Sequence, residues 1–118
     1  MAHDEELAAR VRRILAARSG VREQIVLASL QFMIGGNLCC RVRDDLMVRL
    51  SNEEWEKGLG APHVRSMERG GTPMKGWLFV APDGLRTQRD LKRWVNAAAD
   101  FTESLPKKKK KKKKPRKR

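Results

Sequence analysis

The chain has 118 residues, 40% of them hydrophobic, and a formal net charge of +13 at pH 7. This length predicts one domain large enough to have an apolar core. The charge does not describe that domain, because eleven of the 27 basic residues lie among the last twelve positions, and the other 16 against 14 acidic residues leave only +2. The overall basicity therefore belongs to a tail, and it does not indicate a strongly basic fold.

The first predicted element is a helix over residues 4–18. Asp4 is in place to cap its N-terminus, and two acidic residues follow in the first turn, where they favour a helix. Leu7, Val11 and Ile14 recur at helical spacing on one stripe, and Gly20 follows the helix. This stripe predicts that the helix covers the apolar face of another element.

Residues 21–29 contain a continuous apolar run and predict a strand that leads into a meander over residues 30–50. Apolar and polar residues alternate over 30–34, 38–43 and 46–50, and the separators Gly35-Gly36-Asn37 and Asp44-Asp45 are typical of turns. The three strands thus offer one apolar face and one largely basic face, as in an antiparallel sheet that is covered on one side.

The second half predicts a short helix capped by Ser51, two strands over 63–69 and 74–80, and a last helix that begins at Thr87 and ends before Pro106. We therefore predict an α+β domain over residues 1–105, with an antiparallel sheet of about five or six strands and the N- and C-terminal helices packed on one face. Residues 106–118 are predicted to be a disordered polybasic tail. The predicted core consists of Leu7, Val11, Ile14, Phe32, Leu38, Val42, Val48, Leu78, Trp94, Val95 and Phe101.

Several segments together resemble the N-terminal domain of the TfoX/Sxy family, over about residues 5–105. They are RSGV after the first helix, FMIGGNLCCRVRDDLMVRL, GTPMKGWLFVAPDGL and the Trp-bearing last helix. The resemblance implies a compact α+β domain from a bacterial family whose named members regulate natural competence. Two departures stand out. Residues 26–29 read Val-Leu-Ala-Ser where the family usually has Met-Phe-Gly-Gly, and lysines replace the helical C-terminal domain of the longer regulators.

The two cysteines are adjacent, and on a regular strand their side chains point to opposite faces. A disulfide between them is therefore not expected. Cys40 is predicted to fill the core, and Cys39 to lie beside arginines on the basic face, where cations lower a thiol pKa. A redox-sensing or small enzymatic domain that uses Cys39 is accordingly one alternative function.

No other catalytic or cofactor site is predicted. His3 and His63 match no metal-ligand spacing, and neither glycine pair has the sequence of a phosphate-binding loop. No nucleophile, base and orienting group can be combined, so we expect a non-enzymatic binding or regulatory module without metal or cofactor, and no small-molecule substrate is identified.

The body has one candidate ligand surface, a basic face formed by Arg41, Arg43 and Arg49, which Arg22 could join. Such side chains could contact phosphates. They could equally form the solvated face of a one-sided sheet, and we favour that interpretation because no stacking aromatic residue can be assigned to this face.

The tail is the main predicted site. A flexible polycation binds nucleic acid without sequence specificity by releasing condensed counterions. No stretch of the sequence approaches the roughly 18 consecutive apolar residues of a membrane span. The N-terminus is acidic, whereas that of a signal peptide is basic. We therefore expect a cytoplasmic, nucleoid-associated protein without a membrane partner. The alternative is a protein-interaction domain, including a homodimer, whose tail has no nucleic-acid role. The predicted tail contacts are Lys107, Lys108, Lys109, Lys110, Lys111, Lys112, Lys113, Lys114, Arg116, Lys117 and Arg118.

Overall fold

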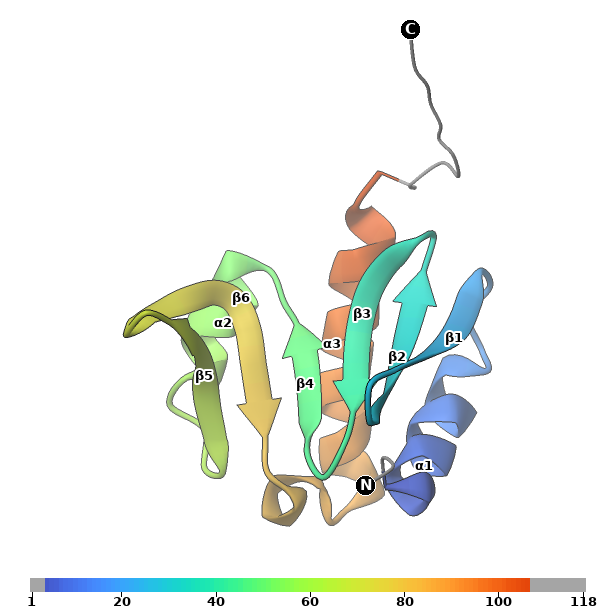
Figure 1. Ribbon diagram of the computed structural model, residues 1–118, viewed down its shortest axis with the longest axis horizontal. Helices are drawn as coiled ribbons and strands as arrows, with labels where there is room; N and C mark the ends of the chain where they lie inside the picture. Colours follow the sequence, from blue (N-terminus) through green and yellow to red (C-terminus); the bar gives the residue numbers. More distant parts are fainter. Residues whose placement is uncertain (1–3, 107–118) are drawn as a thin grey trace, which may run out of the picture.

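The computed structural model describes residues 4–106, in which three α-helices and a six-stranded antiparallel sheet form the domain (Figure 1). The strands are ordered β1-β2-β3-β4-β6-β5, so only β5 and β6 depart from chain order. In sequence, the elements are α1 (Glu5–Leu15), β1 (Val21–Val26), β2 (Ser29–Ile34), β3 (Asn37–Val42), β4 (Leu46–Arg49), α2 (Asn52–Gly58), β5 (Val64–Arg69), β6 (Thr72–Val80), the 3-10 helix η1 (Pro82–Leu85) and α3 (Gln88–Ser104).

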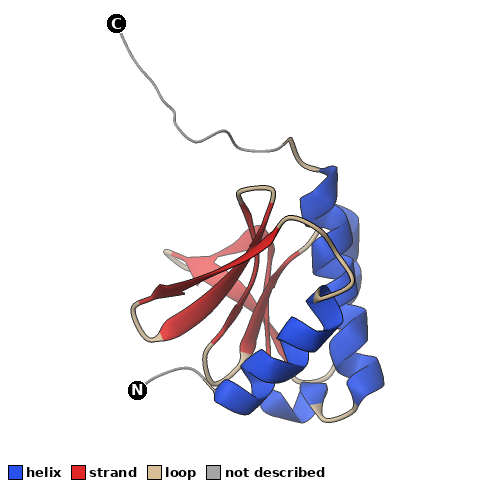
Figure 2. Ribbon diagram, turned by 90° about the vertical axis from the view of Figure 1, so that its right-hand side faces the viewer, coloured by secondary structure: helices blue, strands red, loops and turns tan. Residues whose placement is uncertain are grey.

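The helices all lie on one side of the sheet, as Figure 2 shows, and α3 passes behind β3 and β4 in Figure 1. The predicted α+β class, with N- and C-terminal helices on one face, is therefore confirmed. The other face, which we call the open sheet face, is covered by no helix of the described chain. This one-sided cover follows from strands that are apolar at every second position.

Capping side chains explain where the helices begin. The Asp4 carboxylate accepts hydrogen bonds from the backbone N–H groups of Glu6 (3.0 Å) and Leu7 (3.1 Å), and the Thr87 hydroxyl accepts one from Asp90 (3.0 Å). The first helix ends at Leu15, three residues before the predicted end. Residues 16–20 form the turn and bend that bring the chain back toward β1.

Arg18 therefore lies beyond α1, where its guanidinium reaches α3. It forms ion pairs with Asp100 (3.0 Å) and Glu103 (3.1 Å) and donates a hydrogen bond to the side-chain oxygen of Asn96 (3.1 Å). Burial lowers the pKa of Arg18, but the hydrogen bonds and charges of Asp100 and Glu103 together outweigh it and raise this pKa above its ordinary value. The α1–β1 connection is thereby fixed to the C-terminal helix.

The predicted core is largely present between the helices and the sheet. Ile14 and Phe101 are only partly buried, and Leu38 was wrongly assigned, because it pairs with Met33 and so lies on the open sheet face. Predicted core residues that are buried are Leu7, Val11, Phe32, Val42, Val48, Leu78, Trp94 and Val95.

The sequence also mispredicted the first strand, which was expected over residues 21–29. It ends at Val26, because Leu27 and Ala28 form a two-residue loop between paired Val26 and Ser29. Leu27 takes up a φ of 54°, a conformation that glycine favours. The expected turn at Gly35 and Gly36 is present, with φ values of 61° and 84°.

Candidate functional site

The predicted tail site, Lys107 to Arg118, lies outside the described residues, so its contacts remain a prediction. The described chain ends at Pro106, and this end is held in place. The Asn37 side-chain amide, which is buried at the start of β3, donates a hydrogen bond to the Pro106 carbonyl oxygen (2.9 Å). The tail therefore starts from a fixed point beside the β2–β3 hairpin.

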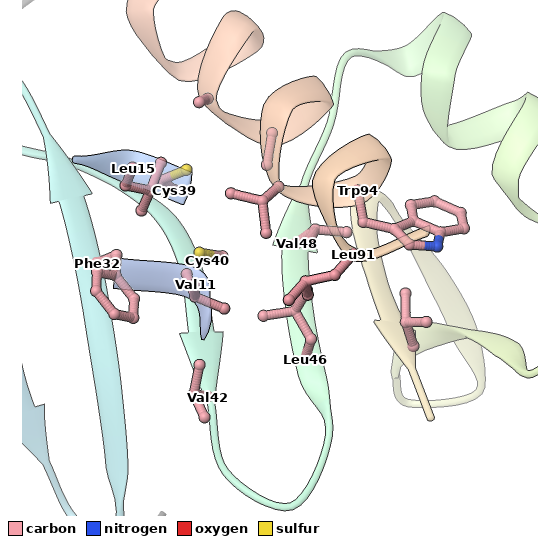
Figure 3. Packing of buried hydrophobic residues seen from close by; sticks show 14 of the residues in the cluster. Val11, Leu15, Phe32, Cys39, Cys40, Val42, Leu46, Val48, Leu91 and Trp94 are labelled. Atoms are coloured by element: carbon pink, nitrogen blue, oxygen red, sulfur yellow. The ribbon is translucent and has the colours of Figure 1, made fainter. Parts of the chain in front are cut away.

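The cysteines do not point to opposite faces, because β3 contains a β-bulge. Phe32 pairs with Cys40, but the next residue of β2, Met33, pairs with Leu38, so Cys39 is the extra residue. Figure 3 shows both cysteines among the buried core residues on the helix side of β3. The prediction that Cys39 shares a face with the basic residues is therefore wrong.

The two adjacent cysteines are free thiols inside the core, and both are 0% exposed. The hydrogen bond from the Cys40 side chain lowers the pKa of Cys39, and burial opposes this change. The same contact, together with complete burial, raises the pKa of Cys40 well above its ordinary value. A thiolate at Cys39 would thus be stabilised by its neighbour, but substrates have no direct access to it.

One row of side chains crosses the open sheet face on all six strands, and Met47 within it is buried. Strand register places Gln24 opposite Gln31, then Arg41, Met47, Phe79 and Arg65 in turn. A second row contains Arg22, Met33 and Leu38 at one end and Arg49 and Trp77 at the other. Of the predicted basic residues, Arg41, Arg49 and Arg22 are therefore on this face.

Arg43 is the exception among the predicted basic residues. It lies one residue beyond β3, in the turn to β4, where its backbone N–H donates to the Asp45 carbonyl oxygen (3.0 Å). Its own carbonyl oxygen accepts a hydrogen bond from the Asp4 N–H (2.9 Å). The exposed Arg43 side chain thus lies at the rim of the sheet.

Two aromatic rings lie on the open sheet face, contrary to the expectation that none could be placed there. The Cζ atom of Arg65 is 4.3 Å from the centroid of the Phe79 ring, and that of Arg49 is 5.3 Å from the centroid of the Trp77 ring. Both distances fit cation–π contacts. Alternation within β6 could have predicted the side of these rings, since Leu78 and Val80 face the core.

The arginines of this face have few carboxylate partners. Asp45 lies 3.4 Å from Arg65, while Arg22, Arg41 and Arg49 form no ion pair with any residue of the described chain. The Arg49 guanidinium also reaches the helix side of the sheet, since its Cζ atom is 5.8 Å from the centroid of the Phe101 ring on α3. The face is therefore basic, with arginine and aromatic side chains interleaved.

A shallow depression of about 510 Å³ lies over β5 and β6, lined by Arg65, Ser66, Met67, Glu68 and Phe79. Glu68 brings a second carboxylate to this side of the face. The depression contains no histidine or cysteine, and within residues 4–106 no three His, Cys, Asp or Glu side chains lie together as a metal site would require.

A groove of about 460 Å³ separates α2 from the C-terminal half of α3 on the opposite side. The charged side chains that line it are mixed in sign, namely Glu54, Asp100 and Arg93. Its serines lie at the ends of the helices, and the groove holds no histidine or cysteine that could act as their base. We find no nucleophile–base pair in it.

Comparison with protein-family models, with curated proteins and with solved structures gives no match. No helix among the described residues is long and apolar enough to cross a membrane.

Proposed function

We propose that the protein is a non-catalytic module that associates with nucleic acid through Lys107–Arg118, without sequence specificity. The distribution of charge is the observation that carries this proposal. Eleven positive charges occupy twelve consecutive residues, whereas the rest of the chain has a net charge of only +2. Lysine ammonium groups are point charges that contact phosphates but do not hold the fixed geometry that recognition of base edges requires.

The resemblance to the TfoX/Sxy N-terminal domain adds a regulatory role to this proposal, with the folded body as the surface for a partner. A thiol-based activity at Cys39 is less well supported, because a reactive cysteine is partly exposed and both cysteines are fully buried.

The test compares the full chain with a variant of equal length in which the eight lysines 107–114 are changed to glutamine. Each neutralised phosphate steepens the log–log salt dependence on duplex DNA by about 0.9. If six to ten tail charges engage, duplex affinity falls about 10³–10⁵-fold between about 50 and 200 mM salt. The glutamine variant should lose most of this affinity and most of the slope.

A duplex of scrambled sequence is the control, and it should bind the native chain equally well. Duplex binding that survives the eight substitutions, with an unchanged slope, would contradict the proposed role of the tail.

A further inference from the structure

The open sheet face combines two properties. Four arginines lie on it, and two of them are stacked over aromatic rings, Arg65 over Phe79 and Arg49 beside Trp77. A solvated face needs neither rings nor arginines without acidic partners. Both are, however, what an unpaired nucleotide chain requires, since its bases stack on aromatic or guanidinium planes and its phosphates bind cations.

We infer that the open sheet face is a binding site for single-stranded nucleic acid, with Trp77 and Phe79 as the stacking platform and Arg41 and Arg49 as the phosphate contacts. This inference deepens the proposed function, because it adds a strand-selective site to a tail that does not distinguish single from double strands.

The spacing of these groups fits an extended chain. Trp77 and Phe79 alternate with the buried Leu78, so their Cα atoms are separated by two residues of one strand, about 6.6 Å. Met47 of β4 lies between Phe79 and Arg41 in the row, which puts the Arg41 backbone about 10 Å from that of Phe79, two strand spacings away. Bases on β6 would therefore have phosphate contacts on the neighbouring strand β4 and on β3 beyond it.

Charge argues for an anion as the occupant. Arg22, Arg41 and Arg49 have no carboxylate partner in the described chain, and Asp45 reaches only Arg65. A guanidinium that lies over a ring keeps its N–H donors at the edge of the stack, where they can meet phosphate oxygens. A duplex would not use this surface, because its bases are stacked on one another and hide their faces from side chains.

The start of the tail lies at the same end of the domain. Asn37 holds Pro106 at the beginning of β3, and Arg49 contacts Phe101, which is five residues before Pro106 on the chain. A polynucleotide held by the residues after Pro106 is therefore kept close to Arg49 and Trp77. Such proximity raises the effective concentration of the strand at the open sheet face.

The test uses full-length chains and two fluorescent probes, a 20-nucleotide oligothymidylate and a 20-base-pair duplex. One variant, Arg41→Gln with Arg49→Gln, removes two charges from the face. A second, Trp77→Leu, removes a stacking plane but keeps apolar bulk. The matched control, Arg13→Gln with Arg89→Gln, removes two exposed helix-side charges that have no ion-pair partner in the described part of the chain. Circular dichroism and urea unfolding verify that each variant is folded.

The native chain should bind the oligothymidylate more tightly than the duplex. Trp77→Leu should lower only the single-strand affinity, by about 5- to 150-fold, the range that corresponds to stacking of one base. The Arg41→Gln/Arg49→Gln variant should weaken single-strand binding at least tenfold more than the Arg13→Gln/Arg89→Gln variant does. The duplex affinities of these two variants should agree within about twofold.

Equal losses on both probes, or losses equal to those of the control pair, would overturn the inference. So would a native chain without single-strand preference, a result that would point to a protein partner for this face. The eight lysine-to-glutamine changes should lower the affinity for both probes, whereas the face variants should lower only the single-strand affinity. Failure of the tail proposal can therefore be told apart from failure of this one.

Discussion

The substitution Phe32→Ala tests the packing of the helices on the sheet. Phe32 is 0% exposed at the centre of β2 and faces α1 (Figure 3). Replacing a fully buried phenylalanine by alanine removes its transfer free energy and leaves a cavity, together about 3–5 kcal/mol. Domains of this size have about 0.05–0.15 kcal/mol of stability per residue, so this one change should remove about a fifth or more of the free energy of unfolding.

Urea unfolding followed by tryptophan fluorescence measures the effect. The midpoint should fall while the m-value stays the same, because the surface exposed on unfolding hardly changes. In a thermal scan, the loss should lower Tm by about 12–40 °C, from about 4–8 °C per kcal/mol for a domain of this size.

The neighbouring strand supplies a matched control. Ile25 on β1 is also a large apolar residue, but it is 71% exposed, so Ile25→Ala should change stability by less than about 0.5 kcal/mol. If Phe32→Ala and Ile25→Ala cost similar amounts, the assignment of Phe32 to the core is refuted.

Three further results are expected. Gly76→Ala should destabilise the domain by at least about 1–2 kcal/mol in urea unfolding. Residue 76 has a φ of +94°, and an added Cβ atom would lie 3.1 Å from the Leu50 carbonyl oxygen, so alanine would be strained there. An unchanged midpoint of unfolding would contradict this reasoning. Leu27→Gly should stabilise the domain by up to about 1 kcal/mol. Glycine adopts the φ of 54° at this loop position without strain, and the Leu27 side chain is 95% exposed, so little packing is lost. A lower Tm would argue against strain at Leu27. Cys39 and Cys40 should react with a thiol reagent at least about 10³-fold more slowly in the native chain than in urea. The reason is that both thiols are buried, so the reaction requires local unfolding that costs about 4 kcal/mol or more. Equal rates would show that the thiols are accessible.

Local signals predicted those parts of the fold that depend on local chemistry. Asp4, Ser51 and Thr87 mark helix starts, and each side chain accepts a backbone hydrogen bond from the first turn. The apolar stripe of α3 identified its buried face for the same reason, since a helix repeats every 3.6 residues whatever it packs against. The α+β class followed from these helices and from the alternating strands.

The open sheet face depended on a pairing between distant segments. β4 and β6 are neighbours although β5 and α2 lie between them in the chain, and only this pairing puts Trp77 next to Arg49 and Phe79 next to Met47. Alternation in β6 gives the side on which each ring lies, but not the strand beside it. An aromatic and basic surface therefore could not be recognised from the arginines of β3 and β4 alone.

The position of Cys39 follows from two constraints that a regular hairpin cannot satisfy together. The two-residue turn at Gly35-Gly36 pairs Ile34 with Asn37, while Leu30 pairs with Val42, and all four side chains are buried. Four residue steps separate Leu30 from Ile34, but five separate Asn37 from Val42, so β3 must contain one extra residue.

Alternation alone cannot show where that residue lies. At Cys39 and Cys40 two consecutive small side chains enter the core, which larger neighbours could not do without overpacking. The adjacent cysteines are thus explained as packing around the bulge, without any requirement for thiol chemistry.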